Sequence, residues 1–261
     1  METKVISIIN YKGGVGKSTV TYNLGAELVN LGKQVLLIDF DGQGNLTKFT
    51  GVENEERISA NIVTMLNEII TGQLDTKDPI YAVKDNLDII ACDIQKESWS
   101  IRALSELARE TILKRYIEII KERYNYDYIL IDNAPSVNLD FQNALVASDE
   151  YLIVTEAEIA SSDGIFTINS VINQIKSCFN KELKASGVVI NKVQENTNFH
   201  KIMNEIINTS FGEGTYIFKT FIPKSIAVPE SEFEMMPLSD YNYKNKAAIA
   251  FRKLAEEFVN K

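Results

Sequence analysis

The sequence predicts an α/β domain in which a mostly parallel sheet is covered by helices on both faces. Short apolar runs rich in β-branched residues recur along the chain, and longer stretches with helical spacing separate them. Continuous apolar runs are typical of strands buried on both faces, and their alternation with helices implies right-handed crossovers between parallel strands. With 261 residues, 45% of them hydrophobic, the chain is long enough for one large domain, and we expect residues 1–261 to form a single one.

The individual elements follow in chain order. After the first apolar run, Val20, Leu24, Leu28 and Leu31 are three to four residues apart, which predicts a helix with one stripe facing the sheet. The stretch from Thr71 to Asp88, with its turn-forming "DTKDP", is interpreted as a surface excursion and not as a domain boundary. The predicted strands are residues 4–10, 34–39, 87–91, 128–132, 151–155 and 187–191.

Charge and cysteine content limit the partners and the compartment. Lys and Arg total 27 against 36 Asp and Glu, so a net charge of -9 repels nucleic acid and anionic membranes unless a local basic patch forms. The spacing of Cys92 and Cys178 matches no metal or redox motif, and both are interpreted as small buried hydrophobes. No run approaches the roughly 18 apolar residues of a membrane helix, and the N-terminus lacks a basic leader, so we expect a cytoplasmic protein.

A glycine-rich stretch, "NYKGGVGKSTV" at residues 10–20, lies between the first predicted strand and the first predicted helix. Its glycines let consecutive backbone N–H groups turn inward around an oxyanion, and the helix N-terminus adds its positive dipole end. This context predicts a phosphate-binding loop. Lys17 would reach the β and γ phosphates, and the Ser18 hydroxyl would bind Mg²⁺. The loop is predicted to consist of Lys12, Gly13, Gly14, Val15, Gly16, Lys17, Ser18 and Thr19.

Acidic residues stand at the ends of two further predicted strands. Asp39 and Asp41 follow the second run, and Asp132 ends the fourth. The carboxyl ends of parallel strands meet at one edge of the sheet, so these side chains should converge with the glycine loop. An ATP–Mg²⁺ complex attracts carboxylates, whereas unpaired acids packed together would repel one another. The sequence therefore predicts a magnesium-dependent nucleotide site at this edge.

Several motifs resemble the ParA/MinD family of deviant Walker A ATPases, and most closely its ParA/Soj-type partition proteins. "KGGVGKS" has the extra early lysine of that signature, Lys12, and Tyr11 stands where the general loop has glycine. "VLLIDFDGQGNLT" resembles the next family motif, and "YILIDNAPS" resembles the Walker B strand. "FIPKS" and "KNKAAIAFRKLAEEF" resemble the C-terminal third, so the resemblance covers nearly the whole chain.

The resemblance implies an ATP-dependent homodimer with ATP and Mg²⁺ as cofactors. In it, Lys12 would cross to the partner's phosphates, where a positive charge offsets the charge that develops during phosphoryl transfer. Asp41 matches the position that orients or activates the attacking water. Asp39 would lie near the Mg²⁺ shell, and Asp132 would hold the metal through water. Asn191 and Pro223 match the positions that contact the base.

The resemblance also implies non-specific DNA binding by the ATP dimer and a ParB-like activator of hydrolysis. Ala227 occupies the family's usual arginine position, and Gly42 and the "DNAPS" segment loosen backbone restraint near the γ phosphate. Each phosphate contact that is lost lowers DNA affinity and its salt dependence. The candidate contacts are Lys192, Lys201, Lys219, Lys224, Lys244, Lys246, Arg252 and Lys253.

Alternatives remain open at this point. One is an ATP-gated dimeric switch that positions a protein cargo and ignores DNA; another is a metabolic kinase, which is disfavoured because no acceptor site is apparent. A membrane-binding C-terminal helix is disfavoured by mixed charge, and its apolar residues are interpreted as packing onto the domain: Ile249, Phe251, Leu254 and Phe258. His200 is expected at the surface, and Trp99 is expected to pack near a helix entry.

Overall fold

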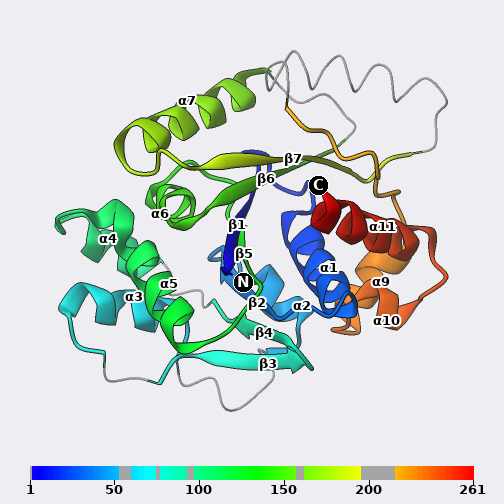
Figure 1. The fold of residues 1–261 in the computed structure, drawn as a ribbon, viewed down its shortest axis with the longest axis horizontal. Coiled ribbons are helices and arrows are strands. Elements are labelled where there is room, and N and C mark those ends of the chain that lie inside the picture. The colour runs from blue at the N-terminus through cyan, green and yellow to red at the C-terminus, as the bar shows by residue number, and fades with distance from the viewer. Residues whose placement is uncertain (1, 53–59, 75–76, 93–96, 157–161, 195–214) are drawn as a thin grey trace.

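The computed structural model describes residues 2–52, 60–74, 77–92, 97–156, 162–194 and 215–261 (Figure 1). Its strands are β1 (Lys4–Ile9), β2 (Val35–Phe40), β3 (Ile80–Lys84), β4 (Leu87–Ile90), β5 (Tyr128–Asn133), β6 (Glu150–Glu156) and β7 (Lys184–Asn191). Its longer helices are α1 (Lys17–Asn30), α3 (Ile62–Thr71), α5 (Ile112–Arg123), α6 (Leu139–Ala147), α7 (Ser162–Cys178) and α11 (Lys246–Asn260). The shorter ones are α2 (Asn45–Phe49), α4 (Glu97–Ala103), the 3-10 turn η3 (Arg109–Thr111), α9 (Ala227–Phe233) and α10 (Leu238–Tyr241).

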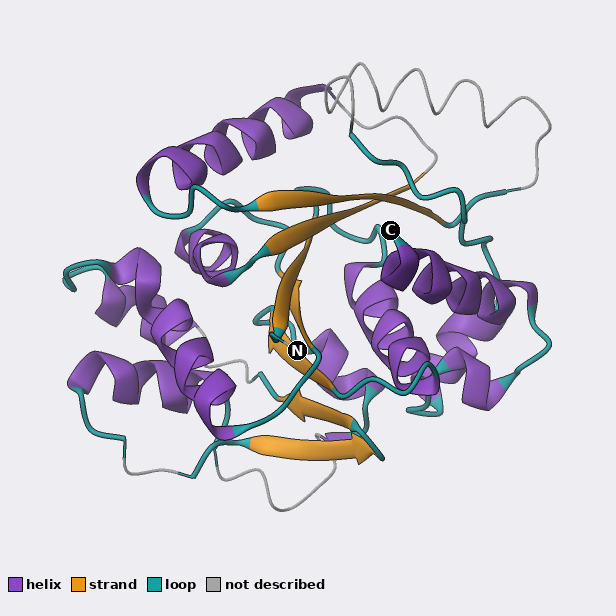
Figure 2. Cartoon of the chain, in the orientation of Figure 1, coloured by secondary structure: helices purple, strands orange, loops and turns teal. Residues whose placement is uncertain are grey.

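The strands form one seven-stranded sheet in the order β3-β4-β2-β5-β1-β6-β7. All neighbouring strands are parallel except β3 and β4, which are antiparallel. Helices α1, α9, α10 and α11 cover one face of the sheet, and α3 to α6 cover the other (Figures 1 and 2). The predicted fold class is therefore confirmed.

Alternating side chains of the strands supply the hydrophobic clusters on the two faces of the sheet. Ile6 and Ile8 of β1 pack into the core beneath α1 and α11, while Val5 packs into the core beneath α3 and α5. Because successive residues of a strand point to opposite faces, an apolar run is needed to fill both cores. This explains why the sequence shows the strands as continuous β-branched runs. Six of the seven strands coincide with predicted runs to within three residues at each end.

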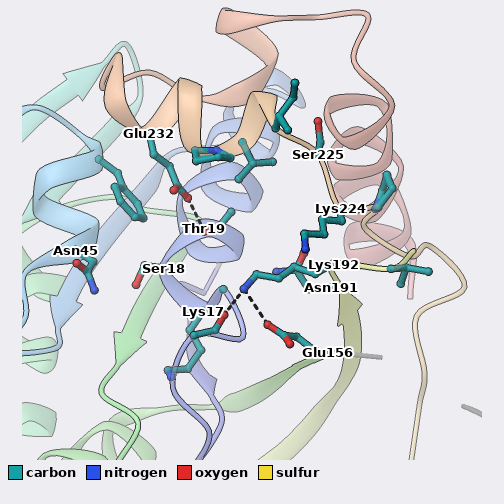
Figure 3. A pocket seen from close by; sticks show the side chains of 18 of the residues that line it. Lys17, Ser18, Thr19, Asn45, Glu156, Asn191, Lys192, Lys224, Ser225 and Glu232 are labelled. Carbon is teal, nitrogen blue, oxygen red and sulfur yellow. Dashed lines mark hydrogen bonds and ion pairs between the residues drawn. The ribbon is translucent and has the colours of Figure 1, made fainter. Parts of the chain in front are cut away.

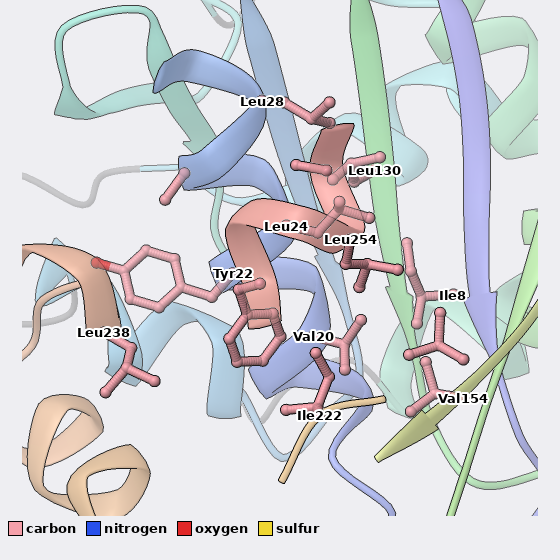
Figure 4. Close-up of a cluster of buried hydrophobic side chains, with 14 of the residues drawn as sticks. Ile8, Val20, Tyr22, Leu24, Leu28, Leu130, Val154, Ile222, Leu238 and Leu254 are labelled. Atoms are coloured by element: carbon pink, nitrogen blue, oxygen red, sulfur yellow. The ribbon is translucent and has the colours of Figure 1, made fainter. Parts of the chain in front are cut away.

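Helix α1 is held firmly between the sheet and the C-terminal helix. Val20, Leu24 and Leu28 are fully buried, and Figure 4 shows Leu24 beside Leu254 of α11 and Leu28 near Leu130 of β5. The stripe predicted on this helix is thus confirmed for three of its four members. Leu31 is 41% exposed because the helix ends at Asn30 and the chain turns away at Gly32, whose φ is +78°.

Several other expectations can be compared with the structure. The stretch from Thr71 to Asp88 was predicted to be a surface excursion, but it contains the edge strand β3, which pairs with β4. Cys92 is buried as expected, whereas Cys178 is exposed because it ends α7 beyond the packed stripe. Trp99 is fully buried, with its ring centroid 6.1 Å from that of Phe40.

The C-terminal helix packs onto the domain largely as expected. Phe251, Leu254 and Phe258 are buried in the α1 core, while Ile249 is 37% exposed on the opposite side of the helix. Within the described part of the chain, no helix combines the length and the apolar character that crossing a bilayer requires. His200 and Lys201 lie outside the described residues.

A segment of the C-terminal third runs along the outer edge of β7. Val188 N donates to Tyr216 O at 2.8 Å, and Ile222 N donates to Ile190 O at 3.0 Å. Gly187 permits this approach, since a Cβ there would lie 2.7 Å from Tyr216 O, and its φ is +144°. The segment thereby brings Pro223 next to the end of β7, on the same edge of the sheet as the glycine loop.

Candidate nucleotide-binding site

The glycine loop connects the end of β1 to the start of α1, as predicted. Gly14 and Gly16 have φ values of +78° and +89°, a conformation that side chains other than glycine rarely adopt. Gly16 is constrained further, because a Cβ on it would lie 2.3 Å from the amide nitrogen of Asn191. Two of the three glycines are therefore required by backbone conformation, one of them also by a close neighbour.

Side chains at the end of β7 hold the carbonyl groups of this loop. Asn191 Nδ2 donates to Val15 O at 2.9 Å, and Lys192 Nζ donates to Gly14 O while pairing with Glu156 Oε1 at 2.8 Å (Figure 3). In a trans peptide the N–H points opposite to the C=O. The N–H groups of Val15 and Gly16 thus point away from β7, as an anion-binding nest requires.

Asp39 and Asp132 lie side by side because their strands pair in register there. Asp39 Oδ2 accepts hydrogen bonds from Thr47 N at 2.8 Å and Thr47 Oγ1 at 2.7 Å, so it fixes the start of α2. Its Oδ1 accepts from Asp41 N at 3.1 Å. Asp41 Oδ1 accepts from Gln43 N at 3.0 Å, and the Asp41 side chain reaches the pocket described below. The convergence predicted for the three aspartates is observed.

Asp132 is fully buried, and neither of its oxygens accepts a well-aligned hydrogen bond from the described residues. Burial and the neighbouring Asp39 raise the pKa of Asp132 well above its usual value, while the nearby Ser18 hydroxyl and Lys17 ammonium lower it. Lys17 is 6% exposed, and its Nζ donates to Lys12 O at 3.5 Å. Burial lowers the pKa of Lys17, against the effect of Asp132 and Asp41.

The Asp132 carboxyl and the Lys17 ammonium fit Mg²⁺ and a phosphate chain. A buried carboxylate without partners beside the Ser18 hydroxyl offers the hard oxygen atoms that Mg²⁺ prefers. A buried ammonium beside a left-handed glycine loop likewise suits phosphate oxygens, to which charge-assisted hydrogen bonds are strong. Ser18 and Asp132 would hold the metal, and the loop with Lys17 would hold the phosphates; bound ATP then supplies the phosphoryl group.

A pocket of about 1360 Å³ opens over the loop and extends to the C-terminal third. Pro223 lies on its wall beside the end of β7, where Val193 N donates to Ile222 O and Lys224 N donates to Val193 O, both at 3.0 Å. Asn191 also lines the pocket, with its side chain against the glycine loop. The predicted site residues on its wall are Gly13, Gly14, Gly16, Lys17, Ser18, Thr19, Asp41, Asn191 and Pro223. The others do not line it: Val15, Asp39 and Asp132 are buried beneath, and Lys12 is exposed beside it.

Sequence reasoning missed some of the pocket's charged side chains. Glu156 ends β6 and could have been found as a polar residue that follows an apolar strand. Lys192 was considered only as a DNA contact, but here it turns onto the glycine loop. Glu232 of α9 had no local signal, since it follows two other acidic or polar residues on a short helix.

A glycine loop between the first strand and first helix of a parallel sheet, with acidic strand ends beside it, defines a P-loop nucleoside triphosphatase. Residues 3–185 match the sequence profile of a family described as an AAA domain. The sporulation initiation inhibitor protein Soj of Bacillus subtilis is 34% identical over 255 residues, covering 97% of each chain. The chromosome partitioning protein ParA of Caulobacter vibrioides is 30% identical, covering 99% of this chain and 94% of its own.

A solved structure agrees with these relatives. The septum site-determining protein MinD of Pyrococcus horikoshii, complexed with Mg-ADP, has a TM-score of 0.77 and 26% identity, covering 99% of this chain and 96% of its own. The chain belongs to the ParA/MinD family of ATPases. As a member of that family it is a P-loop ATPase that uses ATP and Mg²⁺.

Proposed function

We propose that this ATPase is a partition switch: ATP binding drives dimerisation, the dimer binds DNA without sequence preference, and a ParB-like protein stimulates hydrolysis and release. The cargo would be plasmid or chromosomal DNA in the cytoplasm, with the dimer on the nucleoid. The relatives named for chromosome partitioning and for Soj support this proposal. The observation that carries it is the position of Lys12.

Lys12 has a fixed backbone and an exposed side chain. Its N–H donates to Asn10 Oδ1 at 2.9 Å, and its carbonyl accepts from Lys17 Nζ. The side chain lies in solvent beside the pocket and does not line it. A cation held on the rim of an anion site without facing that site is well placed to serve the phosphates of a second copy that stacks on this face.

The remaining site residues have complementary proposed roles. Lys17 holds the β and γ phosphates, Ser18 and Asp132 hold Mg²⁺, and Asp41 orients the attacking water at the pocket wall. Asp39 would position Asp41 and the start of α2, because its oxygens accept hydrogen bonds from Asp41 N and Thr47 N. Asn191 would orient the loop as well as contact the base, since its amide nitrogen is bonded to Val15 O.

Stimulation by a partner is consistent with the contacts of Lys192, the pocket cation that lies on the glycine loop. Lys192 is paired with Glu156 and bonded to Gly14 O, so among the described residues it is not poised to move onto the γ phosphate. An extra cation at the transition state raises phosphoryl-transfer rates by orders of magnitude. We therefore propose slow basal hydrolysis that a ParB-like protein accelerates.

The candidate DNA contacts fall into two groups: cations that already contact other residues of the protein, and cations that are exposed. Lys192 is engaged at the loop, and the Arg252 guanidinium stacks 3.7 Å from the centre of the Tyr243 ring and donates to Tyr243 O. The exposed candidates are Lys219, Lys224, Lys244, Lys246 and Lys253. Lys244 and Lys253 are exposed near and on α11, and we propose them as the leading contacts.

A second candidate function is an ATP-gated dimer that positions a protein cargo and ignores DNA. The net charge of -9 and the internal engagement of two candidate cations favour it. The two functions share the nucleotide switch and differ only in what the dimer holds.

Nucleotide-dependent sizing tests the switch. We expect the wild-type protein to elute as a monomer without nucleotide or with ADP, and as a dimer with ATP and Mg²⁺. Lys12→Ala should bind ATP within a few-fold of wild type and remain monomeric, since its side chain does not line its own pocket. Lys181→Ala, at an exposed lysine near the start of β7, is the control. A wild-type dimer that forms equally well without nucleotide would contradict the role of Lys12.

Retention on arbitrary duplex DNA separates the two functions. With ATP, the wild-type protein should bind duplexes of unrelated sequence, and affinity should fall steeply with salt. Replacing Lys244 and Lys253 together by alanine should lower the slope of log K against log[salt] by about 0.9 per lost phosphate contact. The same protein with Lys181→Ala should keep the wild-type slope. No ATP-dependent retention at low salt would favour the protein-cargo switch.

A further inference from the structure

Three acidic side chains line the nucleotide pocket: Asp41, Glu156 and Glu232. The first two have partners within the protein that account for a carboxylate at those positions. Asp41 accepts from the backbone N–H of Gln43, and Glu156 is paired with Lys192. Glu232, on α9, faces the glycine loop from across the pocket, and Figure 3 shows its side chain directed at Thr19.

The contact between Glu232 and Thr19 is short and direct. Thr19 Oγ1 donates to Glu232 Oε1 at 2.5 Å, while Oε2 has no partner among the described residues. Burial raises the pKa of Glu232, and the Thr19 hydroxyl and the Lys192 ammonium lower it. Glu232 is therefore a half-buried carboxylate with one oxygen bonded to Thr19 and the other available to a ligand or to solvent.

This contact cannot persist unchanged beside a phosphate chain. Thr19 lies in the first turn of α1, directly after Lys17 and Ser18, where the loop and the helix N-terminus attract anions. A phosphate near Thr19 and the carboxylate would both be acceptors of like charge, and the interior of the pocket strengthens their repulsion. We therefore expect Glu232 to leave Thr19 when nucleotide binds and to accept from other donors, because a partly buried carboxylate is stabilised by hydrogen bonds.

A nucleotide supplies such donors in the right part of the pocket. With the phosphates at the glycine loop and the base beside Asn191 and Pro223, we expect the sugar to lie over the first turn of α1, where Glu232 contacts Thr19. α9 also forms the adjoining wall with Val228 and Pro229. The sugar hydroxyls are donors, and an acidic residue that accepts from ribose hydroxyls is the solution found in dinucleotide-binding sheets.

We propose that Glu232 accepts hydrogen bonds from the ribose hydroxyls of the bound nucleotide and makes this site selective for ribonucleotides. The inference rests on the assignment of the loop and of the Asn191 side to phosphates and base. A site built to bond a hydroxyl discriminates strongly against a ligand that lacks it, because its polar group is then left unpaired.

Calorimetric titration with Mg²⁺ and two ligands, ATP and 2′,3′-dideoxy-ATP, tests this inference. Wild-type protein should bind ATP at least about tenfold more tightly than the dideoxy nucleotide. Glu232→Ala should reduce that preference to less than about twofold. Glu234→Ala is the matched control: Glu234 is exposed just beyond the same helix and should keep the wild-type preference. Circular dichroism checks that each variant is folded.

Two outcomes with the Glu232→Ala variant would overturn the inference. In one, Glu232→Ala keeps the wild-type preference for ATP. In the other, it binds both nucleotides equally more tightly, which would mean that the carboxylate acts only by repelling phosphate. Wild-type protein that binds both ligands with equal affinity would refute ribose selection while leaving the ATP site intact. Failure of the wild-type protein to bind either ligand would refute the nucleotide site itself, and ribose selection with it.

Discussion

Lys17→Ala is expected to weaken ATP binding at least about 100-fold and to keep the protein monomeric at ATP concentrations that dimerise the wild type. The Lys17 ammonium is buried beside the loop, so alanine at this position leaves no cation there to contact phosphate. Its removal also leaves Asp132 and Asp41 without the cation that opposes their charge. Calorimetric titration with ATP and Mg²⁺, followed by sizing, measures both effects.

Lys181→Ala serves as the control for Lys17→Ala, because Lys181 is exposed and does not line the pocket. The variant Lys17→Arg separates the effect of charge from that of shape. It keeps a positive charge but places a longer side chain in a buried site, so its affinity for ATP should lie between those of Lys17→Ala and the wild type. An ATP-dependent dimer of Lys17→Ala with near-normal affinity would contradict the assignment of Lys17 to the phosphates.

Asp41→Ala is expected to bind ATP, form the dimer and remain trapped in it, with hydrolysis lowered by a factor of about 10² to 10⁴. Asp41 reaches the pocket wall but holds no part of the glycine loop, so its loss should spare binding. Removing a negative charge near the phosphates would, if anything, favour nucleotide. Phosphate release and the lifetime of the dimer after ATP is chased with ADP provide the measurements.

The backbone role of Asp41 requires its own control. Because Oδ1 accepts from Gln43 N, an alanine could disturb the turn as well as the water position. Asp41→Asn keeps an acceptor for that N–H while it loses the charge, so it should show the same trapped dimer. If Asp41→Asn hydrolysed ATP at the wild-type rate, Asp41 would be a structural residue of the turn and not the one that activates water.

Much of the fold and of the loop could be predicted because local pattern determines them. A strand buried on both faces is apolar at most positions, so β1, β2 and β5 were visible as runs. The loop needs left-handed residues at fixed places, and Gly14 and Gly16 supply them. The convergence of Asp39 and Asp132 followed from parallel pairing alone.

The missed features depend on contacts between distant segments. β3 is half-buried at an edge and alternates weakly, so its pairing with β4 could not be distinguished from a loop. Lys192 and Glu232 reach the glycine loop from positions 178 and 213 residues away in sequence. Contacts between such distant residues leave no periodic pattern in the sequence. The exposure of Cys178 likewise depends on where α7 stops packing against the domain.

The segment that runs beside β7 has a consequence for how copies of this protein can associate. An open strand edge invites a neighbouring molecule to extend the sheet, which leads toward fibres. Backbone bonds from Tyr216 and Ile222 occupy part of the β7 edge, and at the other end β3 has an irregular register and carries Lys84, which is paired with Asp240 at 2.8 Å. Both margins therefore discourage sheet extension, so polymers built strand to strand are disfavoured, and the ATP-dependent dimer that we propose would have to form through another surface.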